Sequence, residues 1–262
     1  MFLHDLLTGW LVRYLTAELP SYQRRVPNDL DRLRAELRPG DVVLVEGKSR
    51  ISRVIMSLSQ SSWSHAAMYI GDALLRWGGP QAEAALDRFG REAAFLLLES
   101  DMNEGVRVRP VADLAEFNLR VCRPQGLVPD DLERVVGEML RHLGVRYDRR
   151  NILDLGRYLT PFHLLPARWR RRPLYLGSST SREVICSALI AKAFYRVGFP
   201  VQPLVAPAPG SRVVARHPSY IMPRDFDLSA TFEVLKFHLA PSRPGAPTGA
   251  PGAEDGDAPT SS

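Results

Sequence analysis

The sequence contains few cysteines and none of the common nucleotide-binding motifs. Cys122 and Cys186 are its only cysteines, too few for a disulfide framework or a cysteine-rich metal site. There is no P-loop, no G-x-G-x-x-G segment and no cysteine–histidine ligand cluster, so we expect neither a cofactor nor a metal. The net charge of +5 is too small to indicate nucleic-acid binding. If the protein is an enzyme, its own side chains carry the chemistry.

Long apolar runs are also missing. No segment approaches the roughly 20 apolar residues that span a bilayer, and the first residues lack the pattern of a secretory signal. The hydrophobic share of 45% and the charged share of 24% are typical of soluble globular proteins. We therefore expect a folded cytoplasmic domain.

Two segments leave room for contact with the inner face of a membrane. Residues 1–19 place apolar side chains at helical spacing and predict an amphipathic helix, which can dock on the protein's own core or lie on a membrane. The basic run Arg168–Arg172 is either solvated surface or a site for anionic lipid or substrate phosphate. Peripheral membrane contact is therefore an open alternative.

The chain divides into three parts by composition. Residues 1–37 hold the amphipathic helix and a polar connector, and residues 38–240 hold the periodic apolar segments of one folded domain. Residues 241–262 consist mainly of Pro, Gly, Ala and Ser, with too little apolar surface to offset the entropy of ordering. We expect a disordered tail there. No pattern predicts the oligomeric state.

Short apolar segments within the domain predict a largely antiparallel sheet with short connections, and hence an α+β fold. The predicted strands cover residues 41–46, 64–71, 93–100, 106–111 and 119–124. Residues 130–143 carry apolar side chains at helical spacing behind Pro129 and predict a helix. Residues 72–92 mix glycine, proline and charge without a sustained period, so we interpret them as a loop insertion.

Cys186 lies in the segment with the strongest helix signals. Thr180 and Glu183 have the spacing of a capping box, and Gly198 followed by Pro200 supplies a stop, which places Cys186 in the early turns of the helix. Backbone amides and the macrodipole at a helix N-terminus favour the thiolate, the nucleophilic form of cysteine. The sequence therefore offers Cys186 as a candidate nucleophile.

Each cysteine also has a structural interpretation. The neighbours of Cys186 are apolar, and a cysteine in such a context is commonly a small core residue. Cys122 alternates with polar residues in a predicted strand and has no neighbouring signal, so we assign it to the core.

A cysteine nucleophile needs a base, and histidine has the suitable pKa. Of the six histidines, His65 opens an apolar strand behind a polar run, which predicts that its ring lies at a sheet edge and faces a neighbouring element. Glu99 closes another apolar strand, where a carboxylate is costly unless it is paired. On adjacent strands, Glu99 could fix the orientation of the His65 ring. A solvent-exposed glutamate at the end of a strand is the alternative.

The segments SHAAMYIG, LLLES, LGVRYD and EVICSALIAKAF, in this order, resemble the circularly permuted branch of the NlpC-type papain-like cysteine hydrolases, the YaeF/YiiX-like group. The likeness spans about residues 38 to 237. In non-permuted relatives the cysteine helix precedes the histidine strand, whereas here His65 precedes Cys186. The resemblance implies a papain-like fold, in which an antiparallel sheet packs against a cysteine-bearing helix and further helices.

The resemblance also implies roles for four residues. Cys186 would be the nucleophile, His65 the base, Glu99 the orienting third member, and Tyr147 the tyrosine whose hydroxyl lies near the oxyanion. Taken from the residues alone, Tyr147 is equally a packing residue at the end of a helix. The Cys186 thiolate would attack an acyl carbonyl to form a thioester.

Three functions remain open. Hydrolysis of an amide in a small peptide-like substrate fits the superfamily. A thioesterase, phospholipase or acyltransferase acting on a lipid-like acyl group fits the amphipathic residues 1–19 and the basic run Arg168–Arg172. A non-catalytic binding module with a structural Cys186 is the third. We expect amide hydrolysis.

Overall fold

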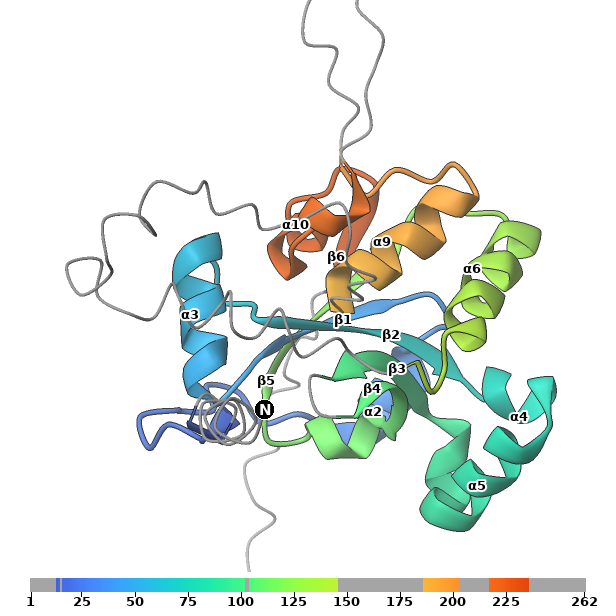
Figure 1. Ribbon diagram of the computed structural model, residues 1–262, viewed down its shortest axis with the longest axis horizontal. Coiled ribbons are helices and arrows are strands. Elements are labelled where there is room, and N and C mark those ends of the chain that lie inside the picture. The colour runs from blue at the N-terminus through green and yellow to red at the C-terminus, as the bar shows by residue number, and fades with distance from the viewer. Residues whose placement is uncertain (1–12, 15, 102–103, 146–185, 203–216, 236–262) are drawn as a thin grey trace, which may run out of the picture.

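A computed structural model describes residues 13–14, 16–101, 104–145, 186–202 and 217–235 (Figure 1). Several predictions fall outside these residues: most of the amphipathic segment 1–19, Tyr147, Arg168–Arg172 and the tail 241–262.

The described residues form an α+β fold around one six-stranded antiparallel sheet with strand order β4-β3-β2-β1-β5-β6. The strands are β1 Val42–Glu46, β2 His65–Gly71, β3 Leu96–Asp101, β4 Gly105–Pro110, β5 Asn118–Pro124 and β6 Phe232–Leu235. The first five strands confirm the sequence prediction to within a few residues. The sixth was not predicted, because its four residues are too few to show a period.

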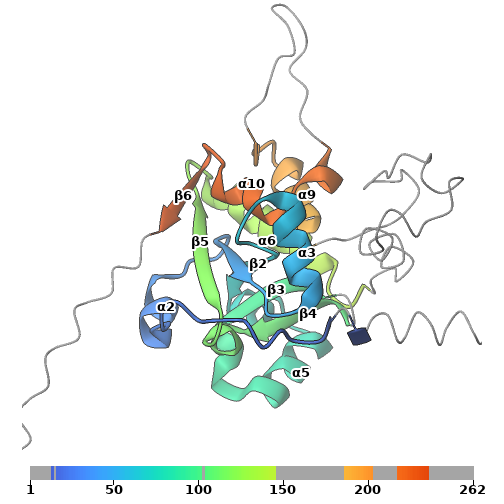
Figure 2. The ribbon, with the colours of Figure 1, turned by 90° about the vertical axis from the view of Figure 1, so that its left-hand side faces the viewer.

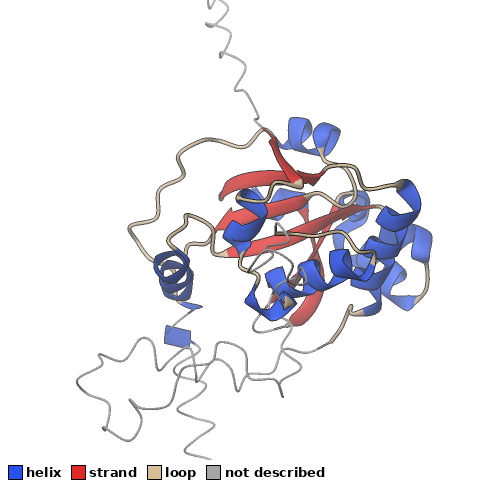
Figure 3. Ribbon diagram, turned by 90° about the horizontal axis from the view of Figure 1, so that it is seen from above, coloured by secondary structure: helices blue, strands red, loops and turns tan. Residues whose placement is uncertain are grey.

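Helices lie on both faces of the sheet and at its ends (Figures 1 and 3). They are α2 Leu30–Glu36, α3 Arg50–Ser59, α4 Ala73–Trp77, α5 Pro80–Phe89, α6 Pro129–Arg141, α9 Cys186–Arg196 and α10 Pro223–Asp227. The predicted helix over residues 130–143 is confirmed as α6.

The interpretation of residues 72–92 as a loop insertion was wrong, because α4 and α5 occupy most of this stretch. Pro80 stands at the start of α5, where its fixed backbone angle suits the first turn. The helix buries the small side chains of Ala82 and Ala85 rather than large apolar ones. A short helix with an alanine face gives no clear apolar period, which explains the error.

The central strand β1 is buried on both faces, and this positions the two halves of the core. Val42 and Leu44 face the larger cluster, which includes side chains of α6, α9 and α10. Val43 and Val45 face a smaller cluster formed with α2 and the short 3-10 turn Val111–Leu114. Neighbouring residues of a strand point to opposite faces of the sheet. A strand that is covered on both faces therefore has a continuous run of apolar residues in its sequence.

An aromatic cluster holds α9 in place at the β6 side of the sheet. The ring of Phe232 meets the rings of Phe194 and Phe226 edge to face, with centroids 5.2 Å and 5.3 Å away. Phe194 belongs to α9 and Phe226 to α10, so the cluster joins both helices to β6 (Figure 2). All three rings are buried, and this packing fixes where α9 presents its first residue, Cys186.

Candidate active site

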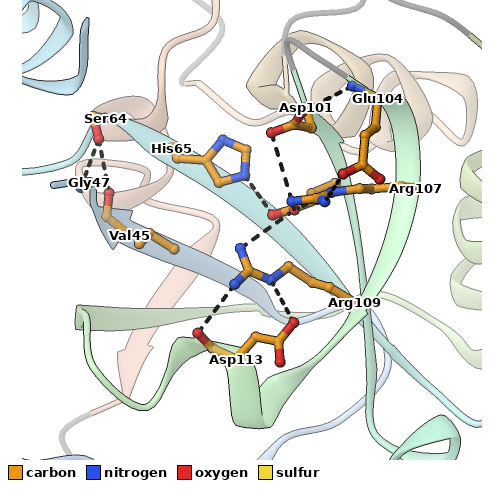
Figure 4. Close-up of polar contacts among 10 residues, drawn as sticks. Val45, Gly47, Ser64, His65, Asp101, Glu104, Arg107, Arg109 and Asp113 are labelled. Atoms are coloured by element: carbon orange, nitrogen blue, oxygen red, sulfur yellow. Dashed lines mark hydrogen bonds and ion pairs between the residues drawn. The ribbon is translucent and has the colours of Figure 1, made fainter. Parts of the chain in front are cut away.

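His65 is the first residue of β2, which lies between β3 and β1 and is therefore not an edge strand of the sheet. It pairs with Val45, next to the last residue of β1. The preceding Ser64 ties the two strands together there. Its backbone N–H donates to the Val45 carbonyl at 3.1 Å, and its Oγ accepts from the Gly47 N–H at 2.9 Å (Figure 4). These contacts fix the backbone directly before His65 and therefore the direction in which its side chain leaves the strand.

Gly47 permits this close approach because it has no side chain. A Cβ added there would lie 2.2 Å from the Oγ of Ser52 and 2.8 Å from the Oγ of Ser64. Real Cβ atoms essentially never come so close, so a larger residue would displace the Ser52 side chain and the Ser64 hydroxyl that ties the backbone before His65 to Gly47. Gly47 thus belongs to the support of the site.

Glu99 orients the His65 ring. The Nε2 atom of His65 lies 2.8 Å from the Oε2 atom of Glu99, and the two residues come from the paired strands β2 and β3. The Glu99 side chain is only 2% exposed, while that of His65 is 27% exposed. An ionised carboxylate can only accept, so Nε2 carries the hydrogen and Nδ1 is the ring nitrogen left for another partner.

Two arginines of β4 neutralise the buried carboxylate from its other side. Arg107 donates from Nε to the Oε1 atom of Glu99 at 3.0 Å and forms an ion pair with that oxygen through Nη2 at 2.9 Å, and Arg109 Nη1 lies 3.5 Å from the same oxygen (Figure 4). Burial raises the pKa of Glu99, but the hydrogen bond and charge of His65 and the two guanidinium groups lower this pKa to about 2. Glu99 is therefore an anion despite its burial.

Cys186 is the first described residue of α9 and is buried. Burial raises the pKa of its thiol, but the charge and hydrogen bond of His65 act against this. Hydrogen bonds from the backbone N–H groups of Ala66 and Ser187 lower the pKa further, so that it falls below the ordinary cysteine value. The sulfur thus sits between an imidazole and two backbone donors.

The His65 ring responds to both of its partners. Burial lowers the pKa of His65, but the charge and hydrogen bond of Cys186, followed by those of Glu99, raise it to about 10. With the lowered pKa of Cys186, this favours a thiolate–imidazolium pair. The described site therefore brings together Cys186, His65 and Glu99 in a chain of contacts.

Cys122 has the opposite environment, as predicted for a core residue. It is fully buried in β5. Burial, together with the negative charge of Asp227, raises the pKa of its thiol to about 12. The two cysteines are thus chemically distinct, and Cys122 is an internal control for the reactivity of Cys186.

Arg107 and Arg109 were not identified from the sequence, although the segment VRVRPV carries a signal for them. In a strand, alternate residues share a face, so two arginines two positions apart point the same way. Such a pair opposite a strand that contains a buried glutamate indicates charge compensation. Tyr147, the fourth predicted site residue, lies outside the described residues.

The described residues show neither a metal site nor a membrane span. Within them, no group of three or more His, Cys, Asp and Glu side chains is placed to hold a metal ion. Over the same part of the chain, no helix combines the length and apolar character required to cross a bilayer.

Comparison with known proteins finds structural similarity without a sequence match. No family model and no curated protein matches the sequence. Among solved structures, the chain is similar to the metalloprotein YiiX from Escherichia coli O157:H7, with a TM-score of 0.47 and 15% sequence identity. The match covers 76% of this chain and 96% of that chain. This neighbour bears the name of the YiiX-like group that the sequence motifs resemble.

Proposed function

We propose that the protein is a cysteine hydrolase that cleaves an amide bond in a small peptide-like substrate through a thioester intermediate. Two features of His65 support the proposal: Glu99 holds its Nε2 atom at 2.8 Å, and His65 and Cys186 act on each other's pKa in the direction of an ionised pair. A buried thiol beside an oriented imidazole is the arrangement that nucleophilic catalysis requires. A structural cysteine needs no such partner, as Cys122 illustrates.

The reaction follows from the protonation states of the pair. The Cys186 thiolate attacks the carbonyl carbon, and electrons move onto the carbonyl oxygen. When the C–N bond breaks, the proton on Nδ1 of His65 passes to the departing amine, leaving a thioester and a neutral imidazole. His65 then takes a proton from water, whose oxygen attacks the thioester and releases the acid and the thiolate. Glu99 holds the ring throughout.

The papain-like, permuted arrangement is part of the same proposal. The antiparallel sheet, the helix beginning with Cys186 and the histidine at the start of β2 are consistent with it. The order along the chain, with His65 before Cys186, is the order of the permuted branch.

A second candidate is a lipid-directed thioesterase, phospholipase or acyltransferase, and α3 favours it. This helix joins β1 to β2 and therefore lies beside the end of the sheet that carries His65 (Figures 1 and 2). Only Ile51 and Ser59 of its ten residues are buried, and Leu58 is 44% exposed. Partly exposed apolar side chains on a helix beside the His65 end of the sheet would accept a hydrocarbon chain better than a polar peptide.

Alkylation with iodoacetamide tests the proposed nucleophile. We expect Cys186 to be labelled selectively in the folded protein at neutral pH and much more slowly in His65→Ala, because the imidazolium no longer stabilises the thiolate. His142→Ala is the matched control, because it removes a histidine that contacts α6 and Lys192 of α9 but not Cys186. Equally slow labelling of Cys186 and Cys122 would contradict the proposal and favour a non-catalytic binding module.

Mass spectrometry of the intact protein separates the two substrate classes. The protein is incubated with muropeptides or with a membrane lipid extract, and covalent acyl adducts are sought on Cys186. Cys186→Ser is the control for adducts at other residues. An adduct from peptide supports amide hydrolysis, whereas an adduct from lipid alone would replace it with the second candidate.

A further inference from the structure

Arg107 makes the most extensive contact with the buried carboxylate behind the His65 ring. It is the cross-strand partner of Glu99 in the β3–β4 pairing, so the sheet register places the two side chains together. Its Nε and Nη2 atoms both reach Oε1 of Glu99, at 3.0 Å and 2.9 Å. The opposite oxygen, Oε2, is the one that faces His65.

All three side-chain nitrogens of Arg107 lie near protein carboxylates. Besides Glu99, Nη1 donates to Glu104 at 2.8 Å, and Nη2 lies 3.7 Å from Asp101. Its side chain is 27% exposed, and its contacts among the described residues are with carboxylates of the protein itself. Arg107 is therefore directed inward, toward the site, rather than outward as a binding residue.

We propose that Arg107 is a positioning residue of the Cys186–His65 pair, acting through Glu99. A planar guanidinium that meets one carboxylate oxygen with two donors restricts how the carboxylate can tilt. This restriction keeps Oε2 directed at Nε2 of His65 and so keeps Nδ1 directed at Cys186. The inference deepens the proposed function, because it assigns a role only if Cys186 and His65 act as a pair.

The charges around the site agree with this role. The groups that face Glu99 are His65 from β2 and Arg107 and Arg109 from β4, and the charged partner facing His65 besides Glu99 is Cys186. Arg109 is a weaker anchor, because it lies 3.5 Å from Oε1 and also contacts the backbone carbonyl of Asp113 at 3.2 Å. Arg107 is thus the residue whose loss should release the carboxylate.

The chain contains a matched control for this arginine. Arg123 of β5 holds the buried Asp41 with Nε at 2.8 Å and Nη2 at 2.7 Å. Asp41 directly precedes β1, whereas His65 pairs with Val45 near the other end of that strand. Arg123→Gln therefore removes a strand arginine from a buried carboxylate far from the thiol.

The experiment compares Arg107→Gln with Arg123→Gln by two measurements on the full-length protein. The first is the proton resonance of the His65 Nε2–H group, assigned by its loss in His65→Gln. The second is the pH dependence of iodoacetamide labelling at Cys186. We expect the resonance to be lost or shifted in Arg107→Gln. We also expect the apparent pKa of Cys186, taken from the pH at which labelling slows in acid, to rise by about one unit, so that the labelling rate below that pH falls up to about tenfold. Arg123→Gln should change neither.

The direction of the shift follows from charge. Removing Arg107 takes away a cation, and a loosened imidazolium stabilises the thiolate less, so both effects disfavour ionisation of Cys186. Unchanged resonance and labelling in Arg107→Gln would overturn the inference, as would equal changes in Arg123→Gln.

Arg107→Lys keeps the charge but cannot reproduce the contact of the planar guanidinium with Glu99. It is used in place of Arg107→Gln if that variant does not fold. We expect Arg107→Lys to restore part of the lowered apparent pKa of Cys186 but not the original His65 Nε2–H resonance. Full rescue of both measurements would overturn positioning in favour of charge alone. If labelling of Cys186 in the unchanged protein shows no apparent pKa below the ordinary cysteine value, the proposed function itself fails, whatever the arginine variants do.

Discussion

The Nε2 atom of His65 lies 2.8 Å from the Oε2 atom of Glu99, a carboxylate that is 2% exposed. This contact commits one ring nitrogen to the protein interior and leaves the other to Cys186. Because Glu99 is itself compensated by Arg107 and Arg109, its charge persists where an isolated carboxylate would take up a proton. The orientation of the base thus depends on residues that do not touch the thiol.

Glu99→Gln should lower the stability of the protein in a pH-dependent way. The folded-state pKa of Glu99 is lowered to about 2 from 4.5, so its contribution is fully present above about pH 4.5 and disappears as pH falls through about 2. Removing one partner of a buried ion pair costs about 3–5 kcal/mol. Urea unfolding at a series of pH values should show this difference near pH 6 and its decline in acid. A difference that does not change with pH would mean that Glu99 is not ionised in the folded protein.

Gly47→Ala should destabilise the protein by about 1–3 kcal/mol, because the new Cβ overlaps Ser52 and Ser64. The strain falls on the backbone before His65, so labelling of Cys186 should slow as well. Thermal unfolding and iodoacetamide labelling check the two effects. Gly137→Ala is the control: its Cβ would meet only the Trp77 ring at 3.4 Å, and alanine is the better residue in a helix interior. Equal stability of the two variants would contradict the packing at Gly47.

Ser187→Ala should loosen the start of α9. The Ser187 Oγ atom donates to the Ile221 carbonyl at 2.6 Å in a buried environment, and its loss leaves that carbonyl without this partner. We expect a loss of about 1–3 kcal/mol in the free energy of unfolding. Cys186 should also become less reactive, because it precedes Ser187 and follows any movement of the helix. If the labelling rate of Cys186 stays the same while the stability falls, the position of Cys186 does not depend on the hydrogen bond between Ser187 and Ile221.

Cys122 should react with iodoacetamide only when the protein unfolds. Its side chain is fully buried and burial raises the pKa of its thiol to about 12. The labelling rate of Cys122 should therefore follow urea concentration, whereas that of Cys186 should be measurable in native buffer. Rapid labelling of Cys122 without urea would contradict its position in the core.

Much of the fold could be predicted from the sequence, because the strands that build the centre carry clear apolar patterns. β1 and β2 are apolar except at the ends occupied by Glu46 and His65, since both faces of the sheet are covered there. The elements that were missed lie at the margins: β6 is short, α5 buries alanines, and α2 was interpreted as polar connector. In these elements local patterns are weak, and contacts distant in sequence decide the structure.

Within the site, His65 and Glu99 were identified because each stands at the polar end of an apolar strand. That they meet could be expected from adjacent strands, but their register could not, because it is set by cross-strand packing. Arg107 was not identified from the sequence, because its position opposite Glu99 also depends on the strand register. Its role becomes visible only once the β3–β4 pairing places it opposite Glu99.

The base half of the site and the nucleophile come from very different distances along the chain. β2, β3 and β4 follow one another and pair as a meander, so His65, Glu99 and Arg107 can assemble through contacts of short sequence separation. Cys186 arrives on a helix far downstream, and contacts of that range form late in folding. A growing chain would therefore carry an unactivated thiol until α9 docks. Under the proposed function, the reactivity of Cys186 is then a property of the completed fold rather than of its helix alone.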